Sequence, residues 1–166
     1  MADHVLIVDD DSTVLTMLYK VMRSNGLYAD TATSGEQCLD MLAQKNYALL
    51  LLDINLTGMD GFGVIEHLRQ HGNKVPIIIV SGRKEDYDTL YGLDIGADDY
   101  ITKPFNPVTL AAKAKALIRR SRDSLSGVDH IISAGPFQYN TKTLPKYFCT
   151  VVPNITQSER FRQLFD

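Results

Sequence analysis

The chain has 166 residues, of which 45% are hydrophobic and 22% charged, and its formal net charge is −3. That length and apolar content suit one full domain with a small appendage and argue against disorder, while the charge lacks the basic excess typical of a nucleic-acid-binding domain without excluding one. The first residues do not form a signal peptide and no apolar stretch approaches about 18 residues, so the sequence predicts a cytoplasmic protein without a membrane span.

Apolar runs of strand length alternate with helix-periodic segments from His4 to about Arg120. The expected strands cover residues 5–8, 28–33, 48–53, 75–80 and 100–101. The expected helices cover residues 12–23, 34–44, 63–70, 86–93 and 107–120, the last with Asn106 as its cap and Pro107 in its first turn. Five such βα units predict an α/β fold, a doubly wound parallel sheet of five strands with a flavodoxin-like architecture. The cysteines, Cys38 and Cys149, lie far apart and predict reduced thiols.

Polar side chains lie at the ends of four of the five expected strands. They are Asp9, Asp10 and Asp11 after the first strand, Asp53 as the last residue of the third, Ser81 after the fourth and Lys103 after the fifth. In a parallel sheet the carboxyl ends of the strands share one edge, where ligands bind. Each residue alone has an ordinary interpretation as a helix cap, a turn residue or a surface lysine. Their joint position favours a common site.

Crowded carboxylates repel one another unless a hard cation neutralises them, and carboxylates with a carbonyl and waters are typical ligands of Mg²⁺. Such an ion can bridge a carboxylate and an incoming phosphoryl group, while Lys103 and Ser81 bind other phosphate oxygens. Asp53 is then the nucleophile and forms an acyl phosphate.

Four segments, VLIVDDDSTV, LLLLDINLTGMDG, PIIIVSGR and GADDYITKPF, resemble the response-regulator receiver domain over about residues 3–122. The resemblance implies a signalling protein, not an enzyme in the usual sense, that takes a phosphoryl group from a sensor histidine kinase and dephosphorylates itself. It implies that Asp53 is the phosphoacceptor and that Asp9 and Asp10 are the acidic pair, with Asp10 a direct Mg²⁺ ligand and the Asn55 carbonyl a further ligand. Lys103 is implied to contact the phosphate, with a cis bond to Pro104. Ser81 and Tyr100 are implied to be the switch pair.

Some positions depart from the family pattern or lie outside it. Thr57 stands where the family often has proline, which predicts a less rigid loop after Asp53. Asn55 and Arg83 resemble the positions that tune acyl-phosphate lifetime. Asp11 lies outside the acidic pair, and we interpret it as a first-turn acid favoured by the helix dipole.

GADDYITKPF followed by LAAKAKALIRR is most similar to the OmpR/PhoB-type regulators, whose receivers pair through the face of helix 4, strand 5 and helix 5. The matching dimer-face residues are Asp98, Asp99, Lys113 and Arg120. Thr89 and Thr109 replace a basic and an acidic residue that usually face each other. Because exposed ion pairs contribute only about 0–1 kcal/mol each, we expect a weak homodimer promoted by phosphorylation.

Residues 123–129 form a polar linker in this interpretation, and residues 130–166 resemble the start of a winged-helix effector domain. AGPFQYN and KYFCTVV are the expected strands, and PNITQSERFRQLF opens a helix with Thr156 and Glu159 in capping-box spacing. The recognition helix does not follow, so we expect no sequence-specific DNA binding by this chain. The tail is either a natural or artificial truncation or a segment with another use.

Three alternatives stay open from the residues. DDDST also fits the motif of haloacid-dehalogenase-like phosphatases, with Asp9 as the nucleophile and Asp11 as the acid, although Asp53 is then unexplained. A flavodoxin-like FMN-binding protein needs a hydroxyl- and glycine-rich phosphate loop where this chain has three aspartates. A receiver-like binding module that is never phosphorylated is the third.

Overall fold

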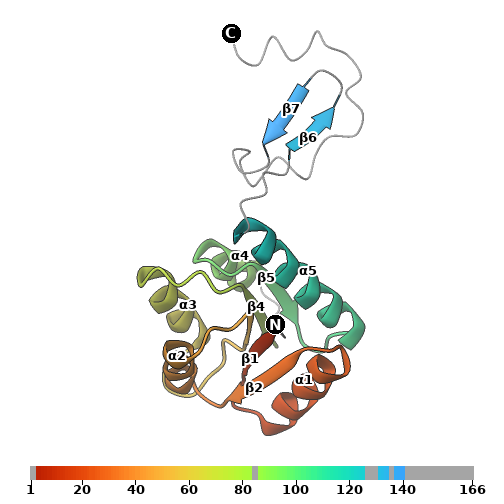
Figure 1. The fold of residues 1–166 in the computed structure, drawn as a ribbon. Coiled ribbons are helices and arrows are strands. Elements are labelled where there is room, and N and C mark those ends of the chain that lie inside the picture. The colour runs from red at the N-terminus through yellow and green to blue at the C-terminus, as the bar shows by residue number, and fades with distance from the viewer. Residues whose placement is uncertain (1–2, 84–85, 126–130, 135–136, 141–166) are drawn as a thin grey trace. The chain divides into compact units, whose positions relative to one another are not determined.

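The structure is a computed structural model that describes residues 3–83, 86–125, 131–134 and 137–140. The chain separates into two compact units, residues 1–126 and 127–166. Five strands of the first unit form one parallel sheet in the order β2-β1-β3-β4-β5 (Figure 1). The strands are β1 (His4–Val8), β2 (Tyr28–Ala32), β3 (Leu49–Leu52), β4 (Ile77–Ser81) and β5 (Asp99–Thr102).

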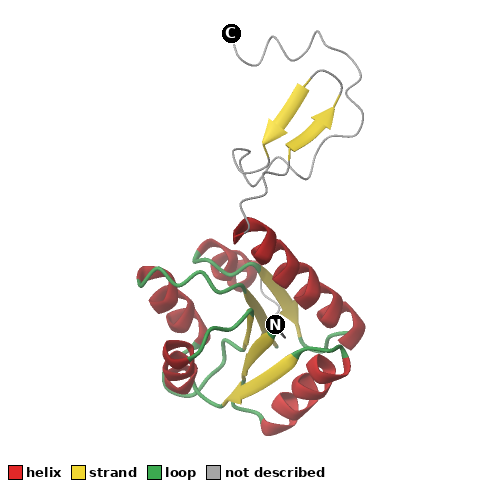
Figure 2. Cartoon of the chain, viewed as in Figure 1, coloured by secondary structure: helices red, strands yellow, loops and turns green. Residues whose placement is uncertain are grey.

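Helices cover both faces of this sheet, as Figure 2 shows. They are α1 (Ser12–Ser24), α2 (Gly35–Gln44), α3 (Gly61–Gln70), α4 (Asp86–Asp94) and α5 (Pro107–Leu125). α1 and α5 cover one face, and α2 and α3 cover the other (Figure 1). The predicted doubly wound α/β fold is confirmed.

The two apolar cores follow from the alternation of side chains along each strand. Val5 and Ile7 of β1 pack under α1 and α5, whereas Leu6 and Val8 pack under α2 and α3. The central strands are buried on both faces, so they read as unbroken apolar runs instead of alternating ones. This is why the sequence LLLL, although it has no periodicity, forms the middle strand β3.

The helix starts are set by capping side chains. Asp11 Oδ1 accepts hydrogen bonds from the backbone N–H of Thr13 at 2.8 Å and of Val14 at 3.4 Å, and these bonds lower its pKa. Asp11 is therefore the N-cap of α1, one position before the first turn where the sequence interpretation placed it. Asn106 caps α5 as predicted, since its Oδ1 accepts from Val108 N at 2.8 Å.

α5 continues to Leu125, beyond the predicted end at residue 120 and into the expected linker 123–129. The polar residues of this turn do not stop a helix, because Ser124 Oγ donates to the Arg120 carbonyl at 2.9 Å and the Arg122 side chain pairs with Asp3. In the second unit, β6 (Ile131–Ala134) and β7 (Phe137–Asn140) pair as antiparallel strands. The predicted strand at AGPFQYN corresponds to β7, while KYFCTVV and the capping-box helix lie outside the described residues.

Within the described part of the chain, none of the helices is long and apolar enough to cross a membrane. Cys38 is a free, buried thiol on α2, and burial raises its pKa to about 12. Cys149 lies outside the described residues.

Candidate functional site

The strand register brings two carboxylates together. Val8 and Leu52 are paired neighbours in β1 and β3, so the residues that follow them, Asp9 and Asp53, leave the sheet side by side. The Asp53 N–H donates to the Val8 carbonyl at 2.9 Å, which continues the ladder by one bond. Both aspartates are nonetheless buried, at 1% and 6% exposure.

Lys103 reaches both carboxylates from the end of β5. Its Nζ donates to Asp9 Oδ2 at 2.6 Å and to Asp53 Oδ2 at 2.7 Å. Its backbone N–H donates to the Ser81 carbonyl at 2.7 Å, and the following bond, Lys103–Pro104, is cis as the resemblance implied. The ammonium group therefore neutralises part of a buried pair of acids.

Burial and hydrogen bonding act in opposite directions on the pKa of Asp9 and on that of Lys103. Burial raises the pKa of Asp9, and the hydrogen bond from Lys103 offsets this only in part. Burial also lowers the pKa of Lys103, but its hydrogen bonds to Asp53 and Asp9 outweigh burial and leave that pKa raised. Lys103 is therefore cationic, and its ammonium group is shared between two buried carboxylates.

Asp10 and Asn55 lie at the rim of this site. Asp10 is exposed and its Oδ2 accepts a hydrogen bond from Thr57 Oγ1 at 3.2 Å. The backbone N–H of Asn55 donates to Asp53 Oδ1 at 3.0 Å, so that both oxygens of the Asp53 carboxylate are engaged. Among the described residues, no three histidine, cysteine or acidic side chains are arranged to hold a metal ion. The predicted ligands thus share one edge of the sheet without forming a closed cage.

The predicted switch residues lie on the other side of the site. Ser81 is fully buried at the end of β4, and its Oγ accepts from Arg83 N at 3.4 Å. The Tyr100 hydroxyl donates to the Arg83 carbonyl at 3.1 Å, and burial raises the Tyr100 pKa. Arg83 Nε donates to Asn55 Oδ1 at 2.8 Å. Arg83 therefore connects the loop after Asp53 to the loop that carries the switch pair.

The loop after Asp53 is bonded to other segments of the chain at two points, and the lower rigidity expected from Thr57 stays a prediction. Besides the bond to Asp10, Glu36 of α2 accepts from Met59 N at 3.1 Å. Gly58 allows the turn between these two contacts with φ of +85°. Sequence reasoning missed this tether because Glu36 is distant along the chain and an acid at the start of a helix carries no signal of a remote partner.

The four residues expected on the dimer face differ in their contacts within the chain. Asp98 Oδ2 accepts from Ile77 N at 2.9 Å and lies 3.5 Å from Arg69 of α3, so it holds the start of β4 within its own chain. Asp99 and Lys113 are paired at 2.6 Å. Arg120 is exposed. Their joint place on a dimer face stays a prediction.

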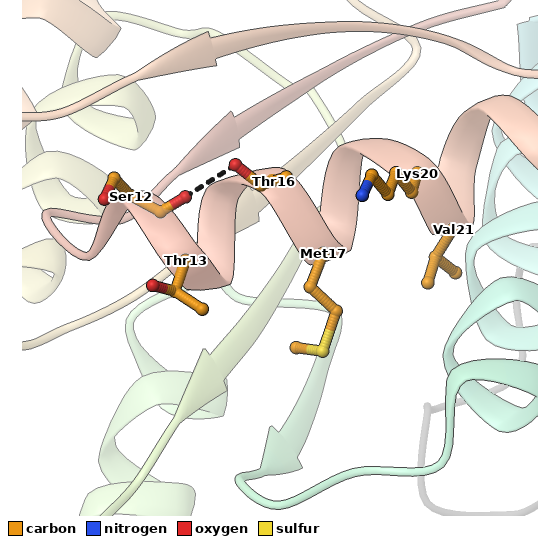
Figure 3. A pocket seen from close by; sticks show the side chains of 6 residues that line it. All are labelled: Ser12, Thr13, Thr16, Met17, Lys20 and Val21. Carbon is orange, nitrogen blue, oxygen red and sulfur yellow. Dashed lines mark hydrogen bonds between the residues drawn. The ribbon is translucent and has the colours of Figure 1, made fainter.

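A separate shallow hollow of about 540 Å³ lies on α1 (Figure 3). Its lining residues are Ser12, Thr13, Thr16, Met17, Lys20 and Val21. Met17 is 40% exposed, and the Thr16 hydroxyl is occupied by a bond to the Ser12 carbonyl at 2.8 Å. The hollow contributes no side chain to the acidic site.

Comparison with known proteins identifies the family to which this sheet and its acidic site belong. The model of the response regulator receiver domain matches residues 5–115, more than half of the chain. The chain belongs to the receiver-domain family. The family match also removes the haloacid-dehalogenase-like alternative as the best explanation of DDDST, because the receiver family explains Asp53 as well.

Curated relatives of this receiver include transcriptional regulators. It is 38% identical over 135 residues to the transcriptional regulatory protein PrrA of Mycobacterium tuberculosis, covering 81% of this chain and 58% of the relative. It is 37% identical over 121 residues to the alkaline phosphatase synthesis transcriptional regulatory protein PhoP of Bacillus subtilis, covering 73% and 50%. These relatives are OmpR/PhoB-type regulators, which confirms the predicted subfamily resemblance. The receiver spans about half the length of the curated relatives it matches.

Solved receivers share the fold. The Francisella response regulator 1452 receiver domain is 28% identical with a TM-score of 0.70, and the match covers 72% of this chain and 98% of that one. A response regulator described as putative from Chloroflexus aurantiacus is 34% identical with a TM-score of 0.69, over 72% and 100% of the two chains. The receiver described here is therefore part of a two-component response regulator, a signalling protein and not a classical enzyme.

Proposed function

We propose that this chain accepts a phosphoryl group on Asp53 from a sensor histidine kinase in a Mg²⁺-dependent reaction. The observation that carries the proposal is the Lys103 ammonium, which bonds both Asp9 and Asp53 at the carboxyl edge of the sheet. A structural ion pair alone needs one acid. The second buried acid is available to a cation, while Lys103 and Ser81 at the neighbouring strand end provide binding groups for the phosphoryl oxygens.

Asp9, Asp10, Asp53 and the Asn55 carbonyl are the groups that would hold Mg²⁺. The donor set fits this ion, because all four are hard oxygen ligands and the single ammonium group of Lys103 is shared between Asp9 and Asp53. When bound, the ion neutralises charge on the acids and on the incoming phosphoryl group.

The chain's own residues then have distinct tasks. An Asp53 carboxylate oxygen attacks phosphorus, the P–O bond to Asp53 forms and the bond to the donor breaks, with the donor's leaving group taking the electron pair. Asn55 N–H orients the carboxylate through Oδ1. The Lys103 ammonium group binds the phosphoryl oxygens. It is already protonated, because its pKa is raised, so this step needs no proton transfer.

The new phosphoryl group adds negative charge and acceptor oxygens beside Ser81. Ser81 and the Arg83 segment close toward it, and Tyr100 follows because its hydroxyl is bonded to the Arg83 carbonyl. The movement of Tyr100 alters the surface formed by α4, β5 and α5. This surface has two conformations, and their populations change according to how much better the phosphorylated site contacts one of them than the other. The proposed output is a homodimer that forms in the cytoplasm and acts in the control of transcription, which is the function in the names of the PrrA and PhoP relatives.

The test is incubation of the full chain with acetyl phosphate and Mg²⁺, followed by intact-mass analysis. The expected result is a gain of one phosphoryl group that disappears with a chelator and in Asp53→Asn. Asp9→Asn keeps the nucleophile and slows the reaction. Labelling that persists in Asp53→Asn and is lost in Asp9→Asn would instead establish Asp9 as the nucleophile. A wild-type chain that no donor modifies would leave the receiver as a pure binding module.

A further inference from the structure

Helix α2 begins against the loop that joins β3 to α3. A Cβ on Gly35, the first residue of α2, would lie 2.8 Å from the Met59 carbonyl oxygen of this loop. Ser34 is the N-cap of α2, and its Oγ accepts a hydrogen bond from Gln37 N at 3.2 Å. The start of α2 therefore has a close contact with the loop and a capping bond that do not involve the Glu36 side chain.

The Glu36 side chain extends from the first turn of α2 to the same loop. Its Oε1 accepts a hydrogen bond from the backbone N–H of Met59 at 3.1 Å, across 23 positions of the chain. Hydrogen bonds from its own backbone N–H and from that of Met59 lower the pKa of Glu36, so the carboxylate is ionised at neutral pH. A Cβ on Gly58 would lie 3.0 Å from this oxygen, so the missing side chain at Gly58 leaves room for the carboxylate.

The hydrogen bond to Glu36 lies next to the residue of the loop with the most conformational freedom. Gly58 has φ of +85°, in a region that glycine enters without strain and other residues rarely adopt. Thr57, which precedes it, donates through Oγ1 to Asp10 Oδ2 at 3.2 Å. Because the backbone can rotate at Gly58, the position of Thr57 relative to Asp10 depends on how the following residue is held. That residue is Met59, the partner of Glu36.

We propose that Glu36 is a positioning residue of the phosphoacceptor site. By holding Met59 it fixes the turn at Gly58, and through Thr57 it orients Asp10, one of the groups that would hold Mg²⁺. This role rests on the proposed function and deepens it, because a helix that supplies no ligand then influences the affinity for the cation.

The ordinary explanation of Glu36 is a first-turn acid that stabilises its own helix through the helix dipole. It predicts that loss of the negative charge destabilises α2 in Glu36→Gln as it does in Glu36→Ala. It also predicts that neither variant changes the affinity for Mg²⁺.

The test is Mg²⁺ titration of the full chain in physiological salt, monitored by amide chemical shifts. Glu36→Ala should weaken Mg²⁺ binding about two- to fivefold, because the hydrogen bond that it removes is exposed and acts at one remove from the ligand. Glu36→Gln keeps an oxygen that accepts from Met59 N, so it should bind Mg²⁺ as the wild type does. Asp40→Ala is the matched control, because it removes an exposed acid from the same helix and should also keep the wild-type affinity.

A double variant shows whether Glu36 acts through Thr57. If it does, Glu36→Ala causes no further loss of Mg²⁺ affinity in the Thr57→Val background, because the contact that Glu36 positions is already absent. The proposal is overturned if the two losses add, or if Glu36→Gln loses as much affinity as Glu36→Ala.

Hydrogen exchange of the Met59 amide without Mg²⁺ tests the first contact by itself. The exchange should be faster in Glu36→Ala than in the wild type and in Glu36→Gln, and equal rates in all three would contradict the role of Glu36. A wild type that binds no Mg²⁺ would contradict the proposed function, and the role of Glu36 with it. A wild type that binds Mg²⁺ no better than Glu36→Ala does would contradict the role of Glu36 alone.

Discussion

The chemistry of the site depends on three charged groups that the sheet brings together. Asp9 and Asp53 are buried carboxylates, and bringing such groups out of water costs more than one ammonium group returns unless the geometry is close. Lys103 provides that geometry at 2.6 and 2.7 Å. Two buried carboxylates share this one ammonium group, and the proposed divalent cation would neutralise the charge that it leaves.

Thr57 provides a specific prediction at this scale. Its hydroxyl donates to Asp10, a proposed Mg²⁺ ligand, from a position where the family often has proline. Thr57→Val keeps the shape but removes the donor, so Asp10 loses its orientation. We expect Mg²⁺ affinity to fall roughly three- to tenfold, less than for a buried outer-shell partner because this contact is exposed. The measurement is Mg²⁺ titration monitored by amide chemical shifts.

Thr57→Ser is the matched control, since it retains the hydroxyl and should bind Mg²⁺ as the wild type does. Equal affinity of the valine and wild-type proteins would show that the hydrogen bond does not position Asp10. A wild type that does not bind Mg²⁺ would contradict the proposed function itself.

At the scale of elements, the start of α3 is packed directly against the backbone of Asp53 and Ile54. A Cβ on Gly61 would lie 2.4 Å from the Asp53 carbonyl oxygen and 2.6 Å from Ile54 Cα, and both are backbone atoms that cannot rotate away. Gly61→Ala should therefore lower the free energy of unfolding by about 3 kcal/mol, as overpacking in a rigid region does. Urea denaturation measures this loss.

Gly63 lies two residues further along the same helix and serves as a control. Its added Cβ would meet only the side chains of Asp60 at 3.3 Å and Met59 at 3.4 Å. Gly63→Ala should change stability by less than about 1 kcal/mol, because a gain in helix propensity offsets the tighter contact. Equal losses in the two variants would mean that the proximity of α3 to Asp53 is not what constrains Gly61.

For the whole molecule, the prediction concerns self-association. Beryllofluoride with Mg²⁺ mimics the acyl phosphate, and light scattering should show a shift from monomer toward dimer that Asp53→Asn abolishes. Arg120 is exposed and its contribution is that of a surface ion pair, so Arg120→Glu should weaken the dimer only about two- to fivefold. A monomer that persists at high concentration with beryllofluoride bound would contradict the dimer.

The sequence predicts which residues form the site better than it predicts which groups those residues bind. Residues at the ends of apolar runs, such as Asp53 and Lys103, are predictable because parallel strands end at a common edge. The role of Asp98 could not be inferred in this way. It binds Ile77 N and lies beside Arg69, partners that become neighbours only when β4, β5 and α3 pack together.

The sequence by itself determined the α/β alternation, the Asn106 cap of α5 and the set of chemical groups at the sheet edge, because apolar periodicity and local hydrogen bonding act over a few residues. Only the tertiary structure decided that Lys103 bonds Asp9 as well as Asp53, that Thr57 reaches Asp10, and that α5 continues to Leu125. Those features join segments far apart in the chain. Their energies depend on distances of a few ångströms that no local pattern encodes.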